Sequence, residues 1–276
     1  MLKQRTLTAL VLAPIGVAII LFLPTAVLAS VLGVLSLLAL WEWARLAGLS
    51  SRPLRGAILA VNAGLLVLLW QLRGQDAAWW VIGAGLAWWL LALAWMRNLA
   101  WGAAPTRENA LIKLAAGELA ILPAWLALIE IHGGADRGHA WALLALMLTW
   151  MADTAAYFAG KRFGTTKLAP RISPNKTRAG AWGALAGAAL LALAGGWLLG
   201  QRGVALAALV ALGLLIVVAS IVGDLFESLL KRQANVKDSG VLIPGHGGLL
   251  DRFDSLFAAL PVFAAGKALL DLAFGP

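Results

Sequence analysis

The chain has 276 residues, of which 62% are hydrophobic and only 13% are charged. A soluble domain is about half apolar and about a quarter charged, so this composition excludes a disordered chain and an ordinary soluble enzyme. The net charge of +9 does not indicate a nucleic-acid partner, because basic residues gather in the cytoplasmic loops of membrane proteins. Cysteine is absent, which excludes disulfides, a thiolate nucleophile and Cys-ligated metals. We therefore expect a polytopic membrane protein.

The apolar residues form runs close to the roughly 20 residues that cross a bilayer as a helix. The first run continues past Pro24 without a convincing cleavage site, so we interpret it as an uncleaved first span. Together the runs predict an all-α fold with about nine transmembrane helices. The predicted spans are 7–23, 25–44, 56–72, 77–96, 111–131, 140–160, 179–199, 203–222 and 254–273.

Basic residues fix the expected orientation. With the N-terminus in the cytoplasm, 18 of the 22 Lys and Arg residues fall on the inner side, which is a strong positive-inside signal. We expect one transmembrane domain over 1–276, with N-terminal membrane helices in 1–140. The predicted catalytic half is 141–276, and its cytoplasmic loops are 161–178 and 223–254.

The loop 161–178 contains six basic residues and no acidic one. Positive-inside placement explains single arginines such as Arg162. The core from Ser173 to Thr177 is different, because it places Lys176 between two hydroxyls just before a helix N-terminus, where anions bind favourably. Ser173, Lys176 and Thr177 are therefore candidates for substrate binding.

The loop 223–254 combines carboxylates, basic residues and glycines. Asp224 and Ser228 share one helical face, and Lys231 and Arg232 follow one turn later. The glycines of the Pro244–Gly248 segment let the backbone approach a ligand and direct N–H groups at a phosphate. Carboxylates near phosphates are the usual ligands of Mg²⁺. The candidate ligands are Asp224, Asp251 and Asp254, and the candidate glycines are Gly245, Gly247 and Gly248.

Three acidic residues lie in or near apolar spans. Asp153 is inside the predicted span 140–160, where an ionisable group is costly and is functional by default. Glu118 lies nearer the inner end of its span. Glu42 stands between two tryptophans and is explained by a position at the membrane interface.

The motifs resemble the bacterial phosphatidate cytidylyltransferase (CDP-diacylglycerol synthase) family over roughly residues 150–260. The similar elements are Trp150-x-x-Asp153-Thr154-x-x-Tyr157, Ser173-Pro174-x-Lys176-Thr177, Gly223-Asp224-Leu225-x-Glu227-Ser228 and Ser228-x-x-Lys231-Arg232-x4-Lys237-Asp238-Ser239-Gly240-x-x-Ile243-Pro244-Gly245-His246-Gly247-Gly248-x-x-Asp251-Arg252-Phe253-Asp254. With this resemblance we assign catalytic roles to Asp224, Asp251, Lys237, Asp238 and His246. Substrate binding is assigned to the following residues: Asp153, Ser173, Lys176, Thr177, Ser228, Lys231, Arg232, Gly245, Gly247, Gly248 and Arg252.

The resemblance implies transfer of a cytidylyl group from CTP to phosphatidic acid, giving CDP-diacylglycerol and pyrophosphate. It also implies Mg²⁺ in a two-metal site, a homodimer, and a place in the bacterial inner membrane with the active site facing the cytoplasm. No nucleic acid is expected. The alternative is an ion- or proton-coupled transporter that uses Asp153, Asp224 and Glu118. A transporter usually has repeated halves and polar residues at the midplane, and neither is evident in the sequence.

Overall fold

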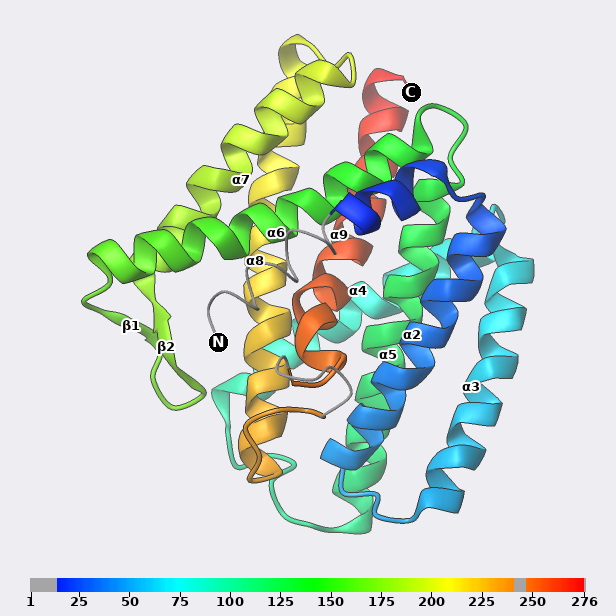
Figure 1. Cartoon of the computed structure of the whole chain (residues 1–276), viewed down its shortest axis with the longest axis vertical. Coiled ribbons are helices and arrows are strands. Elements are labelled where there is room, and N and C mark those ends of the chain that lie inside the picture. Colours follow the sequence, from blue (N-terminus) through cyan, green and yellow to red (C-terminus); the bar gives the residue numbers. More distant parts are fainter. Residues whose placement is uncertain (1–13, 241–246, 276) are drawn as a thin grey trace.

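The computed structural model describes residues 14–240 and 247–275, and its long helices pack into one bundle (Figure 1). Residues 14–22 are helical, so the described part of the predicted first span agrees with a helix, while residues 7–13 lie outside the described residues. The further helices are α2 (Thr25–Leu46), α3 (Arg52–Leu72), α4 (Asp76–Arg97), α5 (Arg107–His132), α6 (Gly138–Phe163), α7 (Arg178–Leu198), α8 (Gly203–Gln233) and α9 (Leu250–Phe274).

Eight described helices are long and apolar enough to cross a membrane, and each corresponds to one predicted span. Side chains at their starts explain several boundaries. The Ser51 hydroxyl accepts a hydrogen bond from Leu54 N at the start of α3, and the Thr106 hydroxyl accepts one from Asn109 N at the start of α5. The all-α membrane region is therefore confirmed.

Helix α8 is longer than the predicted span 203–222. Its 31 residues extend over about 46 Å, which exceeds the roughly 30 Å hydrocarbon thickness of a bilayer. The last three turns therefore project the polar residues of the predicted loop 223–254 on a rigid helix. Much of that predicted loop is thus helical, at its beginning in α8 and at its end in α9.

The predicted loop 161–178 is also more ordered than a connecting loop. Residues 161–163 belong to α6, and the remainder contains a short antiparallel hairpin of β1 (Lys167–Ala169) and β2 (Ser173–Thr177). Lys167 pairs with Thr177, and Ala169 pairs with Ser173. The hairpin leads directly into α7, so it holds the Ser173–Thr177 segment at a fixed place beside the bundle (Figure 1).

Small residues let α7 approach α6 closely. A Cβ on Gly183 would meet the backbone carbonyl of Ala155 at 2.9 Å, and one on Gly187 would meet the Ala155 methyl group at 2.8 Å. Gly180, Gly183 and Gly187 therefore form a packing face of α7. This packing positions the end of α6 next to the start of α7. The hairpin connects these two helix ends.

Aromatic side chains anchor the polar end of α8. Phe226 is completely buried, and its ring centroid lies 5.4 Å from Trp88, 5.5 Å from Trp95, 6.1 Å from Trp89 and 6.2 Å from Trp43. Edge-to-face pairs of this kind add to the free energy of simple apolar burial. Because Phe226 lies between Asp224 and Glu227 in the sequence, this packing fixes the direction in which both carboxylates point.

The two predicted polar loops meet near one end of the bundle. In Figure 1 the hairpin and the connection from α8 to α9 lie toward the lower part of the molecule, whereas the α5–α6 turn and the C-terminus lie at the top. Arg232 Nε of α8 donates a 3.3 Å hydrogen bond to the Ile172 carbonyl beside the hairpin, which joins the two segments directly.

This arrangement allows the orientation to be tested with single cysteines, because the native chain has none. A cysteine at the exposed Asn175 should react with a membrane-impermeant maleimide only from the cytoplasmic side, and one at the exposed Ala135 only from the opposite side. Labelling of intact and inside-out vesicles measures both. The reverse pattern at either position would show that the positive-inside assignment is wrong.

Candidate active site

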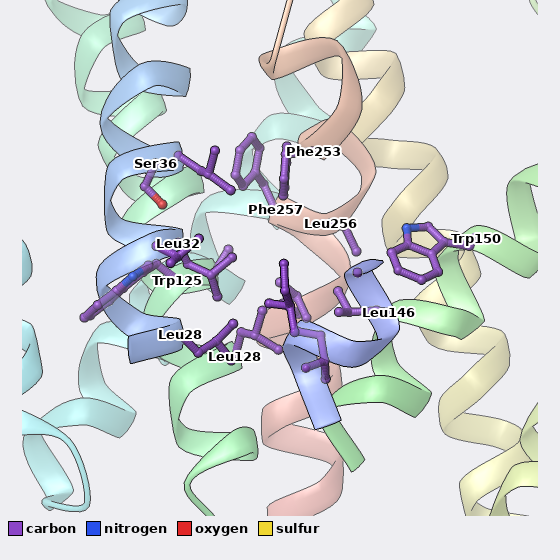
Figure 2. Close-up of a pocket in the computed structure, with 17 residues that line it drawn as sticks. Leu28, Leu32, Ser36, Trp125, Leu128, Leu146, Trp150, Phe253, Leu256 and Phe257 are labelled. Carbon is purple, nitrogen blue, oxygen red and sulfur yellow. The ribbon is translucent and has the colours of Figure 1, made fainter. Parts of the chain in front are cut away.

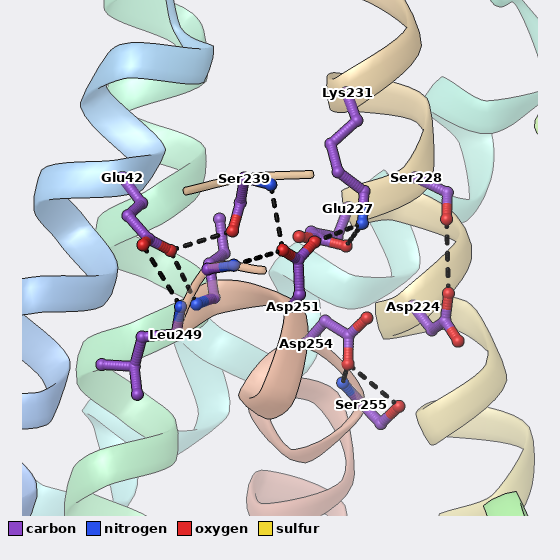
Figure 3. Close-up of polar contacts among 12 residues, drawn as sticks. Glu42, Asp224, Glu227, Ser228, Lys231, Ser239, Leu249, Asp251, Asp254 and Ser255 are labelled. Atoms are coloured by element: carbon purple, nitrogen blue, oxygen red, sulfur yellow. Dashed lines mark hydrogen bonds and ion pairs between the residues drawn. The ribbon is translucent and has the colours of Figure 1, made fainter. Parts of the chain in front are cut away.

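Four polar side chains lie along one side of the C-terminal part of α8. Asp224 and Ser228 are four residues apart, as are Glu227 and Lys231, so the members of each pair are neighbours on the helix surface. Lys231 Nζ lies 2.5 Å from Glu227 Oε2 and 2.6 Å from Asp251 Oδ1, at the start of α9. One partly buried ammonium group therefore joins two helices through two carboxylates (Figure 3).

Asp251 also organises the connection between α8 and α9. Its Oδ2 accepts hydrogen bonds from Ser239 N at 3.0 Å and from Gly248 N at 2.8 Å. Gly247 has a φ of +86°, and a Cβ there would meet Asp251 Oδ2 at 2.8 Å, so both the conformation and the space favour glycine. A single carboxylate thus holds both ends of the segment that contains residues 241–246.

Asp224 faces away from that connection, toward the hairpin. It forms an ion pair with Lys176 of β2 and accepts a hydrogen bond from Ser228 Oγ at 3.3 Å. Asp153, Lys176 and Asp224 line one cavity of about 750 Å³. Ser173, Asn175, Lys161 and Lys167 line it as well, so it combines hydroxyl, amide, ammonium and carboxylate groups. Its volume lies in the range of small-molecule sites.

Asp254 lies one turn after Asp251. Its Oδ1 accepts a 2.7 Å hydrogen bond from Ser255 N, and Gly223 of α8 packs against its backbone (Figure 3). The carboxylates of α8 and α9 are thus concentrated where these two helices touch.

A divalent cation fits the charges of this cluster, although the cluster is no preformed cage. Among the described residues, no three carboxylate or imidazole side chains converge as a metal site does. Three carboxylates, Asp224, Glu227 and Asp251, share the ammonium groups of Lys176 and Lys231, and Glu227 Oε1 is buried without a hydrogen-bond partner in the described chain. Carboxylate oxygens are the donors that Mg²⁺ prefers.

Other predicted site residues surround this cluster: Thr177 lines the cavity, and Asp238 lies near Gly247. Lys237 and Asp238 are exposed in the connection, and Arg252 is exposed at the start of α9. Thr177 is buried, and its hydroxyl caps α7 by accepting a hydrogen bond from Gly180 N at 3.1 Å. Gly245 and His246 lie outside the described residues.

Two carboxylates that the predicted site omits belong to the cluster. Glu227 could have been found, since it stands four residues before Lys231 on the same helical face. Glu42 could not, because its neighbours in the sequence are apolar and aromatic. Its interpretation as an interfacial residue is wrong: the side chain is 2% exposed and contacts Ser239, Leu249 and Leu250.

An apolar pocket of about 190 Å³ lies beside the start of α9 (Figure 2). Leu28 and Leu32 of α2, Trp125 of α5 and Trp150 of α6 contribute to its wall. Helix α9 contributes Phe253, Leu256 and Phe257 to the wall of the pocket. Phe253 therefore faces apolar side chains, while its neighbour Asp254 belongs to the charged cluster. One helix turn therefore separates an ionic site from a space suited to an acyl chain.

The fold and the site define a polytopic membrane protein with a charged site at one end of its bundle. A model of the Cytidylyltransferase family matches residues 3–269. A phosphatidate cytidylyltransferase of Pseudomonas aeruginosa is 44% identical over 273 residues, covering 96% of each chain. The one of Haemophilus influenzae is 36% identical, over 96% of this chain and 98% of its own. The chain belongs to the cytidylyltransferase family, and the resemblance seen in the sequence motifs is confirmed.

The cavity geometry separates two basic residues that composition alone treats alike. Lys176 pairs with Asp224 inside the cavity, whereas the Arg162 guanidinium lies over the Phe163 ring at the end of α6. We expect Lys176→Ala to raise the CTP concentration needed for half-maximal rate or to lower turnover by about tenfold or more, the effect of losing one charged contact. Arg162→Ala should stay within about twofold.

Steady-state rates of both purified variants measure this difference. Equal and small effects would mean that Lys176 serves only the positive-inside distribution of charge.

Proposed function

We propose that this protein transfers the cytidylyl group of CTP to phosphatidic acid and releases pyrophosphate. A phosphate oxygen of phosphatidic acid attacks the α-phosphorus of CTP. The bond from that phosphorus to the oxygen bridging the α- and β-phosphates breaks, and pyrophosphate leaves with the electron pair. The names of the two long relatives support this substrate pair. The observation that carries it is the start of α9, where Asp251 of the charged cluster stands beside Phe253 of the apolar pocket, while Asp224 joins the cluster to the charged cavity.

The proposed reaction needs groups that neutralise negative charge more than it needs a general base. Phosphatidic acid brings its own nucleophile, because a phosphate monoester is largely dianionic at neutral pH. The reactants and the leaving group are all anionic, so cationic groups must offset their repulsion. Lys176, Lys161 and Lys167 line the cavity and are suited to the triphosphate of CTP. Lys231 stands at the cluster, paired with Asp251 at the start of α9.

We assign Mg²⁺ to this cluster, with Asp224, Asp251 and Asp254 as the residues that would hold it. When bound, the cation supplies Lewis-acid stabilisation of the developing negative charge. The resemblance to the family extends this proposal to a second metal ion and to a homodimer. The three carboxylates that share two lysines, and the Glu227 oxygen without a hydrogen-bond partner in the described chain, support at least one divalent cation.

We place the enzyme in the bacterial inner membrane with this site facing the cytoplasm. The positive-inside bias supports that orientation, and so does the nature of the substrates, since CTP is water-soluble and phosphatidic acid resides in the bilayer. A transporter is less well supported. Glu118 accepts a 3.3 Å hydrogen bond from Asn62 between α5 and α3, and it does not line the cavity that Asp153 shares with Asp224.

The reaction can be tested with purified protein in detergent. Pyrophosphate release should require CTP, phosphatidic acid and Mg²⁺ together. Release without phosphatidic acid, or no release under any of these conditions with folded protein, would contradict the proposed function.

Asp224→Asn and Asp251→Asn should each lower turnover by about 10²-fold or more at saturating Mg²⁺, because one negative charge is removed where the cation is held. Asp238→Asn should cost less, since Asp238 is exposed in the connection and we expect it only to order that segment. Asp136→Asn is the matched control, because Asp136 is exposed in the α5–α6 turn at the opposite end. Pyrophosphate release gives the rates, and thermal unfolding verifies the fold. Rates of both cluster variants within a few-fold of wild type would contradict the metal assignment.

A further inference from the structure

Glu42 contacts the active-site cluster from a helix that is remote in the sequence. It lies on α2, yet its Oε2 accepts hydrogen bonds from Ser239 Oγ at 2.9 Å and from Leu250 N at 2.8 Å, and its Oε1 accepts one from Leu249 N at 3.2 Å (Figure 3). The side chain is 2% exposed, and no ion pair with a described residue involves it. A buried carboxylate is costly unless hydrogen bonds compensate it, and here all three donors belong to the connection or to the start of α9.

The contacts explain how α9 begins. Its N-cap residue is Leu249, whose side chain cannot accept a hydrogen bond, and the helix has no side-chain cap of its own. The first N–H groups of a helix need acceptors, and a negative charge there is favourable. Glu42 supplies both to Leu249 and Leu250 from across the bundle.

The contacts also explain two glycines of the connection. A Cβ on Gly240 or on Gly248 would collide with the Glu42 carboxylate. Neither glycine has a positive φ, so lack of space, and not the backbone conformation, requires glycine at both positions; at Gly248 the space is taken by Ser239 as well as by Glu42. Arg45, one turn further along α2, donates a hydrogen bond to the Ser239 carbonyl and strengthens the same junction.

Glu42 and Asp251 bind the same two segments from opposite sides. Ser239 donates its hydroxyl to Glu42 and its N–H to Asp251, while Gly248 donates its N–H to Asp251 directly before the two amides that Glu42 binds. A displacement of Glu42 would therefore release the first turn of α9, and with it the Asp251 carboxylate that meets Lys231.

We propose that Glu42 is a positioning residue for the cytidylyl transfer, acting as a remote N-terminal cap that sets the place and direction of the first turn of α9. This inference rests on the proposed role of Asp251 in the reaction. It makes α2, a helix of the N-terminal region, part of the active site without contact to the substrates.

The test compares Glu42→Gln with Glu130→Gln. Glu130 is a matched control, because it also accepts a backbone hydrogen bond, from Gly74 N at 2.8 Å, but at the opposite end of α5 from the cluster. In Glu42→Gln we expect exchange at the Leu249 and Leu250 amides to accelerate by about tenfold or more, and turnover to fall by a similar factor. The Mg²⁺ concentration for half-maximal rate should rise, and KM for CTP should stay within about threefold.

These readouts separate positioning from general destabilisation. A protein that was only less folded would lose protection in every helix and would keep the Mg²⁺ requirement of wild type. If Glu42→Gln does not fold, Ser239→Ala removes one of the three donors and should show the same changes at smaller size. Unchanged protection of Leu249 and Leu250, with turnover within twofold of wild type, would overturn the inference in either variant.

Hydrogen exchange followed by mass spectrometry does not depend on the reaction. Altered protection in a protein whose wild type releases no pyrophosphate would contradict the proposed function while leaving the capping contact of Glu42 intact.

Discussion

Lys231 is the cation on which the polar end of the bundle depends. It lies partly buried between Glu227 of its own helix and Asp251 of α9, and removing a charge from water is costly unless the charge is paired. Without this ammonium the carboxylates of α8 and α9 would repel one another at the point where the two helices touch. The position of Lys231 in turn depends on Phe226, which the buried tryptophans hold one turn earlier on α8.

The first turn of α9 receives contacts from every side. Lys231 of α8 binds Asp251, and Glu42 of α2 binds the backbone amides of Leu249 and Leu250. Phe253, in the same turn, lines the apolar pocket. Charged groups and hydrocarbon are thereby separated by the width of one helix. An enzyme that joins a nucleotide to a lipid needs such a boundary, because its substrates differ in polarity and must meet at one phosphate.

The hairpin β1–β2 serves the same site from the other side of α8. It brings Lys176 to Asp224 and is held by Arg232 through the Ile172 carbonyl. The glycine face of α7 against α6 is what permits this, because a close helix pair places the end of α6 and the start of α7 beside α8. Packing deep in the bundle therefore determines where a polar contact forms at its end.

Much of the molecule could be predicted from the sequence alone. Apolar runs of bilayer length determine the spanning helices, since the backbone must satisfy its own hydrogen bonds in hydrocarbon. The spacing along one helix face also predicts that Asp224, Ser228 and Lys231 act together, because helical geometry is local.

Contacts between helices are not encoded at any fixed spacing, and only the tertiary structure decided them. Nothing around Glu42 in the sequence distinguishes it from an interfacial residue, yet packing of α2 against α9 makes it the acceptor for two helix-end amides. The sequence also does not show that the Thr177 hydroxyl caps α7 by accepting a hydrogen bond from Gly180 N, in addition to lining the cavity. The sequence by itself determined which residues carry charge and which helices span the membrane. The three-dimensional packing decided which charges meet, because burial and pairing depend on neighbours that are far apart along the chain.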